Sequence, residues 1–168
     1  MAAWVTIYLR DLVAKLSLVA LWRDLAGLPD WHMLAETLGI EDAEVDAVIS
    51  HLVWSDDPLE IRLEGRRPLQ FHVWSAPDRV REEVFELDQI AGAPAVPASV
   101  RAHLASVQSI IAIELGASQL DTMFEIVAFE VAYYLAEQHN GLIRGPNDAW
   151  FDHAAHRWNP INVMVVTT

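Results

Sequence analysis

The sequence predicts an α+β fold in which a single mixed or antiparallel sheet packs against helices, with a helical pair in the N-terminal part. Residues 109–115 form a near-continuous apolar run, which is typical of a strand buried on both faces. Residues 59–64 and 69–74 alternate apolar and polar side chains and indicate a half-buried hairpin. Residues 120–138 have the pattern of the longest helix in the chain.

The N-terminal third is predicted to contain one strand and three helices. Residues 4–10 alternate and are rich in β-prone side chains, so we expect a strand there. Residues 11–25 show little amphipathic contrast and predict a largely buried helix. Asp30 can cap a short helix over residues 31–38. Residues 42–52 predict a clearer helix, because apolar residues recur at i, i+3, i+4 and i+7.

The elements on either side of the buried strand follow from turn and cap residues. A helix is expected over residues 75–88, and a shorter one over residues 99–105 leads into the strand. The pair at residues 140–141, Asn-Gly, ends the long helix as a left-handed cap would. Residues 142–144 and 149–151 flank a Gly-Pro-Asn-Asp turn and predict a second hairpin.

Composition and charge limit the possible partners. We expect one domain over residues 1–168, because 53% of the residues are hydrophobic, with residues 89–98 as the only candidate internal boundary. The chain has 24 acidic and 11 basic residues, giving a net charge of −13. Such a protein repels nucleic-acid phosphates and anionic lipid, whereas a basic protein partner is attracted to it.

The cysteine count and the N-terminal region restrict chemistry and location. The sequence contains no cysteine, which excludes disulfides, thiolate catalysis and cysteine-ligated metal centres. The apolar stretch over residues 12–22 is much shorter than the roughly 20 residues needed to span a bilayer. No small-residue cleavage site follows it cleanly, so we expect a buried helix in a cytoplasmic protein.

Residues 35–74 have the order of elements found in a winged helix, with residues 44–52 as the recognition helix and the hairpin as the wing. Residues 41–60 nevertheless contain seven acids and no Lys or Arg, so this surface would be repelled by DNA. A helix pair packed on the sheet is one interpretation of this region. A winged-helix regulatory module that binds protein is the other.

Two groups of residues could carry chemistry. Asp152, His153 and His156 could bind a divalent metal, with His139 or Asp148 completing the site; the alternative is that they are simply exposed polar residues. In the buried strand, Glu114 is either a general base or a solvated residue at the rim of the sheet. No catalytic motif or phosphate-binding loop is present, and we expect no cofactor.

The long helix has apolar side chains on two faces. One broad stripe should pack on the sheet. On the other face, Ile126, Phe129 and Tyr133 recur at i, i+3 and i+7, and acidic residues flank them. Exposed aromatic rings rimmed by carboxylates are typical of an interface for a basic partner. The alternative is that a second layer of helices covers this face.

The C-terminal part of the chain resembles a known class of proteins. Residues 124–137 (FEIVAFEVAYYLAE), 141–143 (GLI) and 148–152 (DAWFD) resemble the end of several bacterial polymorphic-toxin immunity proteins. The likeness covers less than a third of the chain, and no toxin-binding residue can be transferred from it. It implies a non-enzymatic acidic protein that neutralises a toxin by covering its active site or substrate groove.

The sequence therefore predicts an inhibitor or immunity protein for a basic partner. The residues expected to bind that partner lie on the long helix and on the acidic helix before the first hairpin: Glu125, Phe129, Glu130, Tyr133, Glu137, Asp42, Glu44 and Asp46. The first alternative is a small metal- or carboxylate-dependent enzyme using Glu114, Asp152, His153 and His156. The second alternative is the protein-binding winged-helix module.

Overall fold

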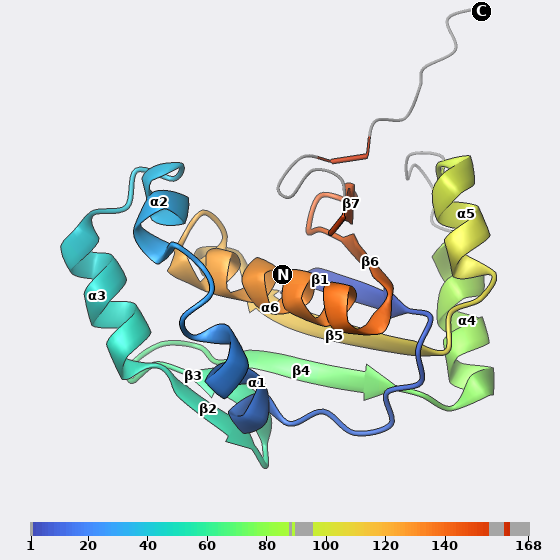
Figure 1. Ribbon diagram of the computed structural model, residues 1–168, viewed down its shortest axis with the longest axis horizontal. Helices are drawn as coiled ribbons and strands as arrows, with labels where there is room; N and C mark the ends of the chain where they lie inside the picture. The colour runs from blue at the N-terminus through green and yellow to red at the C-terminus, as the bar shows by residue number, and fades with distance from the viewer. Residues whose placement is uncertain (1, 88, 90–95, 155–159, 162–168) are drawn as a thin grey trace, which may run out of the picture.

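The computed structural model describes residues 2–87, 89, 96–154 and 160–161. These residues form a seven-stranded antiparallel sheet of order β2-β3-β4-β5-β1-β6-β7, flanked by helices (Figure 1). The elements are β1 (Ala2–Leu9), α1 (Leu18–Leu25), α2 (Trp31–Glu36), α3 (Asp42–His51), β2 (Val53–Asp56), β3 (Leu59–Arg62), β4 (Leu69–Trp74), α4 (Pro77–Leu87), α5 (Ala98–Leu104), β5 (Ser109–Gly116), the 3-10 helix η1 (Ala117–Gln119), α6 (Met123–His139), β6 (Gly141–Arg144) and β7 (Trp150–Asp152). The predicted α+β class, with one sheet against helices and an N-terminal helical pair, is confirmed.

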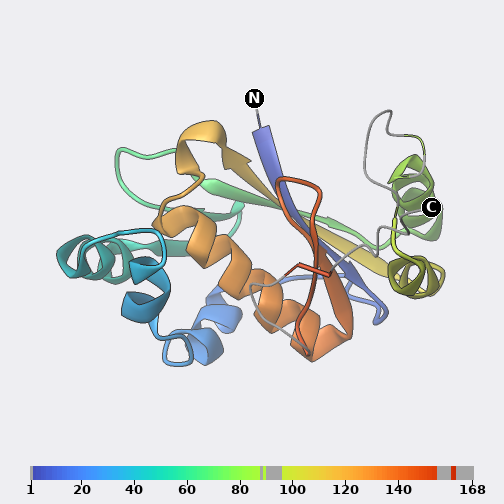
Figure 2. The same cartoon turned by 90° about the horizontal axis from the view of Figure 1, so that it is seen from above.

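The two faces of the sheet are covered differently. Helices α1, α2, α3 and α6 lie on one face, whereas α4 and α5 cover only one end of the other (Figure 2). Alternation along β1 sets this division, because Val5, Ile7 and Leu9 join the core beneath α6 while Tyr8 joins the smaller core beneath α4 and α5. The larger core therefore has α6 at its centre.

Local signals set both ends of α6, which begins at Met123, three residues after the predicted start at residue 120. Thr122 is the N-cap, and its hydroxyl accepts a hydrogen bond from the Phe124 N–H. Asn140 ends the helix in the left-handed conformation with φ 57°, as predicted. A Cβ on Gly141 would lie 2.6 Å from Leu9 Cδ2, so only glycine fits between α6 and β1. The second hairpin, β6 with β7, follows directly and is confirmed.

The first hairpin is confirmed as β3 and β4, but it is not a wing. Strand β4 continues the sheet by pairing with β5, in a register that places Phe71 opposite Ile113. This pairing contradicts the winged-helix alternative, because a wing would lie beside α3 as a separate hairpin. Strand β2 was not predicted. It is four residues long, it pairs only with β3, and its polar Ser55 and Asp56 obscure any alternation.

The predicted helix over residues 11–25 begins only at Leu18. The segment before it uses its backbone groups for tertiary hydrogen bonds: Arg10 N–H donates to the Asn140 carbonyl, and Val13 N–H donates to Ser109 Oγ. Such bonds compete with the hydrogen bonds of a helix, so the chain stays irregular, with bends, until Ser17. There the Ser17 hydroxyl caps α1 by accepting from the Ala20 N–H.

The candidate boundary at residues 89–98 falls largely outside the described residues. Strands β1 to β4 precede it and β5 to β7 follow it, all in the same sheet. Helices α4 and α5, on either side of it, pack on the same end of that sheet through Val80 and Val100. No helix in the described part of the chain is long and apolar enough to cross a membrane.

Candidate functional site

The aromatic residues on the second face of α6 are buried. Phe129 and Tyr133 expose only 4% and 1% of their surface. The Phe129 ring meets Phe151 of β7 edge to face at 5.3 Å between centroids. The interpretation of these rings as exposed is therefore wrong. The alternative that another layer covers this face is correct, although strand β7 rather than a helix covers Phe129. The i, i+3, i+7 pattern showed an apolar face but could not show what covers it.

The three carboxylates flanking those rings have different surroundings. Glu130 is 2% exposed and belongs to the core. Glu137, near the C-terminal end of α6, is exposed to solvent. Glu125, in the first turn, is half-buried and faces a cavity. Of the residues predicted on this helix, only Glu125 and Glu137 are therefore placed to contact a partner directly.

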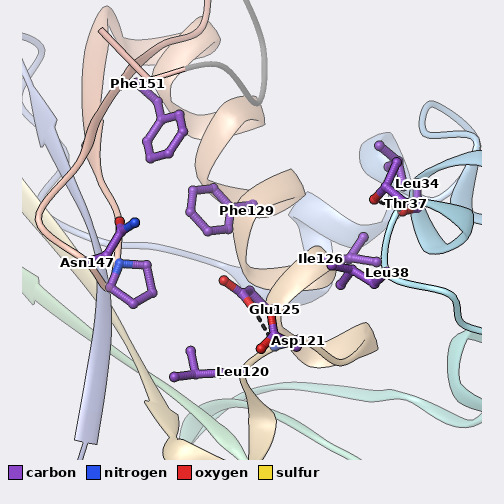
Figure 3. A pocket seen from close by; sticks show the side chains of 11 residues that line it. Leu34, Thr37, Leu38, Leu120, Asp121, Glu125, Ile126, Phe129, Asn147 and Phe151 are labelled. Atoms are coloured by element: carbon purple, nitrogen blue, oxygen red, sulfur yellow. Dashed lines mark hydrogen bonds between the residues drawn. The ribbon is translucent and has the colours of Figure 1, made fainter. Parts of the chain in front are cut away.

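The cavity lies between α2, the N-terminal half of α6 and the turn joining β6 to β7 (Figure 3). Its volume is about 600 Å³, within the range of roughly 300–1,000 Å³ that is usual for ligand pockets. We call it the α2–α6 pocket. Its walls are mostly apolar, and it is lined by Leu34, Thr37, Leu38, Leu120, Asp121, Glu125, Ile126, Phe129, Pro146, Asn147 and Phe151.

Two carboxylates lie together in this pocket. The Glu125 carboxylate accepts a hydrogen bond of 2.6 Å from the backbone N–H of Asp121 (Figure 3). Burial raises the pKa of Glu125, and the nearby negative charge of Asp121 raises it further, while the hydrogen bond opposes both effects. Asp121 itself has φ 56°, a left-handed conformation that is unfavourable for most residues. Among the described residues, neither carboxylate forms an ion pair.

The predicted acidic edge on α3 is only partly brought together. Asp42 and Asp46 share one side of the helix. The Nδ1 atom of His32 on α2 lies 3.0 Å from the Asp42 carboxylate, and its Nε2 atom lies 3.0 Å from the Asp46 carboxylate. The hydrogen bond to Asp42 is the main cause of the raised pKa of His32, and Asp46 adds to it. Glu44 is on another side of α3 and lines a small hollow with Arg66. We keep the name acidic edge for Asp42 and Asp46.

Glu114 has close partners and is neither a solvated rim residue nor a base facing a nucleophile. It lies on the sheet face that α4 and α5 leave partly open, where it forms an ion pair with Arg67. His72 Nε2 is 3.6 Å from the other carboxylate oxygen of Glu114. Trp4, the cross-strand neighbour of Glu114 on β1, is 38% exposed. The arrangement is a charged cluster on an open sheet face.

The candidate metal ligands do not converge in the described part of the chain. His153 Nδ1 lies 3.2 Å from the Gly141 carbonyl and 3.7 Å from Asp152. Asp148 instead forms an ion pair of 2.6 Å with Arg144. His156 lies outside the described residues. Within the residues that can be described, no group of three His, Cys, Asp or Glu side chains could hold a metal ion.

The α2–α6 pocket was missed by sequence reasoning because three distant segments form it. Leu38 and Glu125, for example, belong to helices far apart in the sequence, and only the fold brings them to one cavity. Comparison of the chain with protein-family models, with curated protein sequences and with solved structures gives no match. The site itself, an apolar pocket with paired carboxylates beside an acidic edge, is therefore the basis for assigning a function.

Proposed function

We propose that this protein is a non-enzymatic acidic inhibitor, of the immunity-protein kind, that binds and neutralises a basic protein such as a toxin in the cytoplasm. The observation that carries the proposal is the presence of exposed apolar side chains close to carboxylates. Met33 and Leu38, at α2, expose 59% and 39% of their surface, and the acidic edge of Asp42 and Asp46 lies on the adjoining α3. Apolar side chains surrounded by charge are typical of protein interfaces.

The charge of the chain supports a basic partner over other classes. A net charge of −13 creates a negative potential that accelerates the approach of a positive protein and disfavours nucleic acid. His32 on α2 is the only basic side chain paired with the acidic edge in the described structure, and it is half-exposed. Both carboxylates of this edge are themselves exposed, so at least one of their two negative charges remains for a partner even when His32 is protonated.

The test is complex formation with the purified product of the neighbouring gene. We expect a complex that weakens as salt rises, because surface charge attraction is screened. The double variant D42K/D46K should weaken it, whereas D78K/E82K on α4, at the far end of the sheet (Figure 1), should not. Each acid-to-lysine change adds two charges, so both variants alter net charge equally. Equal weakening by both, or a complex insensitive to salt, would contradict the proposal.

A further inference from the structure

We propose that the α2–α6 pocket receives an arginine side chain of the basic partner, with the aliphatic stem against Leu38 and Ile126 and the guanidinium between Asp121 and Glu125. This inference rests on the proposed function and deepens it, because it names the group that the partner inserts. The pocket adjoins the proposed interface directly, since Leu38 is one of the exposed apolar side chains and also lines the pocket.

The lining of the pocket matches a long side chain with a charged end. Figure 3 shows Asp121 and Glu125 together near Leu120 at one end, and the Phe129 and Phe151 rings at the other. An arginine has this same division, because its three methylene groups are apolar and its terminal group is charged. An anionic group would be repelled by the two carboxylates, and a purely apolar group would leave them unpaired and less hydrated.

Neither Asp121 nor Glu125 is the residue that would best stabilise the fold at its position. Burial raises the pKa of Glu125, so ionising this carboxylate is less favourable in the folded protein than in water. A glutamine at position 125 would avoid this penalty and could accept the same hydrogen bond from the Asp121 N–H. Glycine would likewise suit the left-handed backbone of residue 121 better than aspartate. Residues that are unfavourable for the fold and meet in one pocket are typical of binding sites.

Guanidinium fits this pair better than ammonium. Two adjacent carboxylates offer several acceptor oxygens, and the planar fork of an arginine can donate to more than one at a time. A lysine ammonium is more strongly hydrated and acts as a point charge, so it gains less from a half-buried site. We therefore expect the pocket to discriminate between the two cations, which small alkyl probes can measure.

The experiment uses the full chain and needs no partner protein. Methyl signals of Leu34, Leu38 and Ile126 are followed by NMR while n-butylguanidinium, n-pentylammonium, n-pentanol or pentanoate is added. We expect n-butylguanidinium to shift these signals and to bind about tenfold more tightly than n-pentanol, the gain typical of one charge-assisted hydrogen bond. Pentylammonium should fall between them, and pentanoate should bind least. Equal binding of n-butylguanidinium and n-pentanol would overturn the inference.

Variants assign the effect to the pocket. Glu125→Gln should lose the preference for n-butylguanidinium over n-pentanol while keeping its hydrogen bond to Asp121, so the variant remains folded. Glu137→Gln, an equal change of charge at an exposed site of the same helix, should leave the preference unchanged. Loss of the preference in both variants, or retention in Glu125→Gln, would contradict the inference.

The outcome is separable from that of the proposed function. If n-butylguanidinium binds through Glu125 but D42K/D46K does not weaken the complex with the neighbouring gene product, the pocket inference stands and the proposed function fails. If that complex depends on the acidic edge but n-butylguanidinium binds no better than n-pentanol, the proposed function stands and the arginine-binding pocket is wrong.

Discussion

Truncating Phe129 tests the finding that the second face of α6 is a core surface. Its ring is 4% exposed and packs edge to face on Phe151. Replacing a buried Phe by Ala costs about 3–5 kcal/mol of unfolding free energy, and part of that is the aromatic pair, worth roughly 0.5–1.5 kcal/mol. Because Phe129 also borders the α2–α6 pocket, the removed volume adds to an existing space, so we expect the lower end, about 3 kcal/mol.

Urea denaturation gives the unfolding free energy directly, and thermal melting should show a decrease of roughly 6–12 °C at 2–4 °C per kcal/mol for a domain of this size. The matched control is Phe85→Ala on α4, where the ring is 66% exposed. That substitution should change stability by no more than about 0.5 kcal/mol. If Phe129→Ala were as mild as Phe85→Ala, Phe129 would be a surface residue, and our account of the second layer would be refuted.

Three further predictions concern titration and capping. Glu125→Gln should raise the unfolding free energy at pH 7 but not below pH 4.5. The pKa of Glu125 is higher in the folded state than its ordinary value of 4.5, so its ionisation destabilises the folded protein as pH rises above 4.5, and glutamine removes this effect. Urea denaturation at both pH values measures the difference. Burial lowers the pKa of His103, whose neutral ring donates from Nε2 to the Tyr8 carbonyl at 2.8 Å. Below pH 6.5 the unfolded chain therefore binds a proton at this residue more readily than the folded protein does, and the unfolding free energy should fall as pH drops. His103→Gln should flatten that dependence. Ser17→Ala removes the N-cap of α1 and should cost about 1 kcal/mol, measured by the same method, whereas no loss would show that the bonds of Ser17 to Ala20 and Asp56 do not stabilise the helix.

Periodicity and end signals predicted much of the fold. Alternation identified β1, β3 and β4. The apolar run at residues 109–115 identified β5, because the central strand of a covered sheet needs apolar side chains on both faces. Asn140 marked the end of α6, since its left-handed conformation is a local property of the chain. Features that depend on neighbouring residues in this way are readable from sequence.

Features that depend on distant partners were not predicted. Residues 11–17 have the composition of a helix, but the backbone N–H groups of Asp11 and Val13 donate to His139 of α6 and Ser109 of β5 instead. The burial of Phe129 depends on Phe151, in a strand that follows α6, and no periodicity within α6 reports this contact. The carboxylate of Glu125 was predicted to bind a partner from an exposed face. The structure instead places it in a pocket, a site that exists only because α2 and the β6–β7 turn meet there.

Amide hydrogen exchange in the complex tests most directly whether α2, α3 and the start of α6 form the partner-binding surface. With the neighbouring gene product bound, we expect slower exchange in α2, α3 and residues 121–126, and unchanged exchange in α4 and α5 at the other end of the sheet. Slower exchange confined to α4, α5 or the open sheet face around Trp4 and Glu114 would show that the partner binds elsewhere.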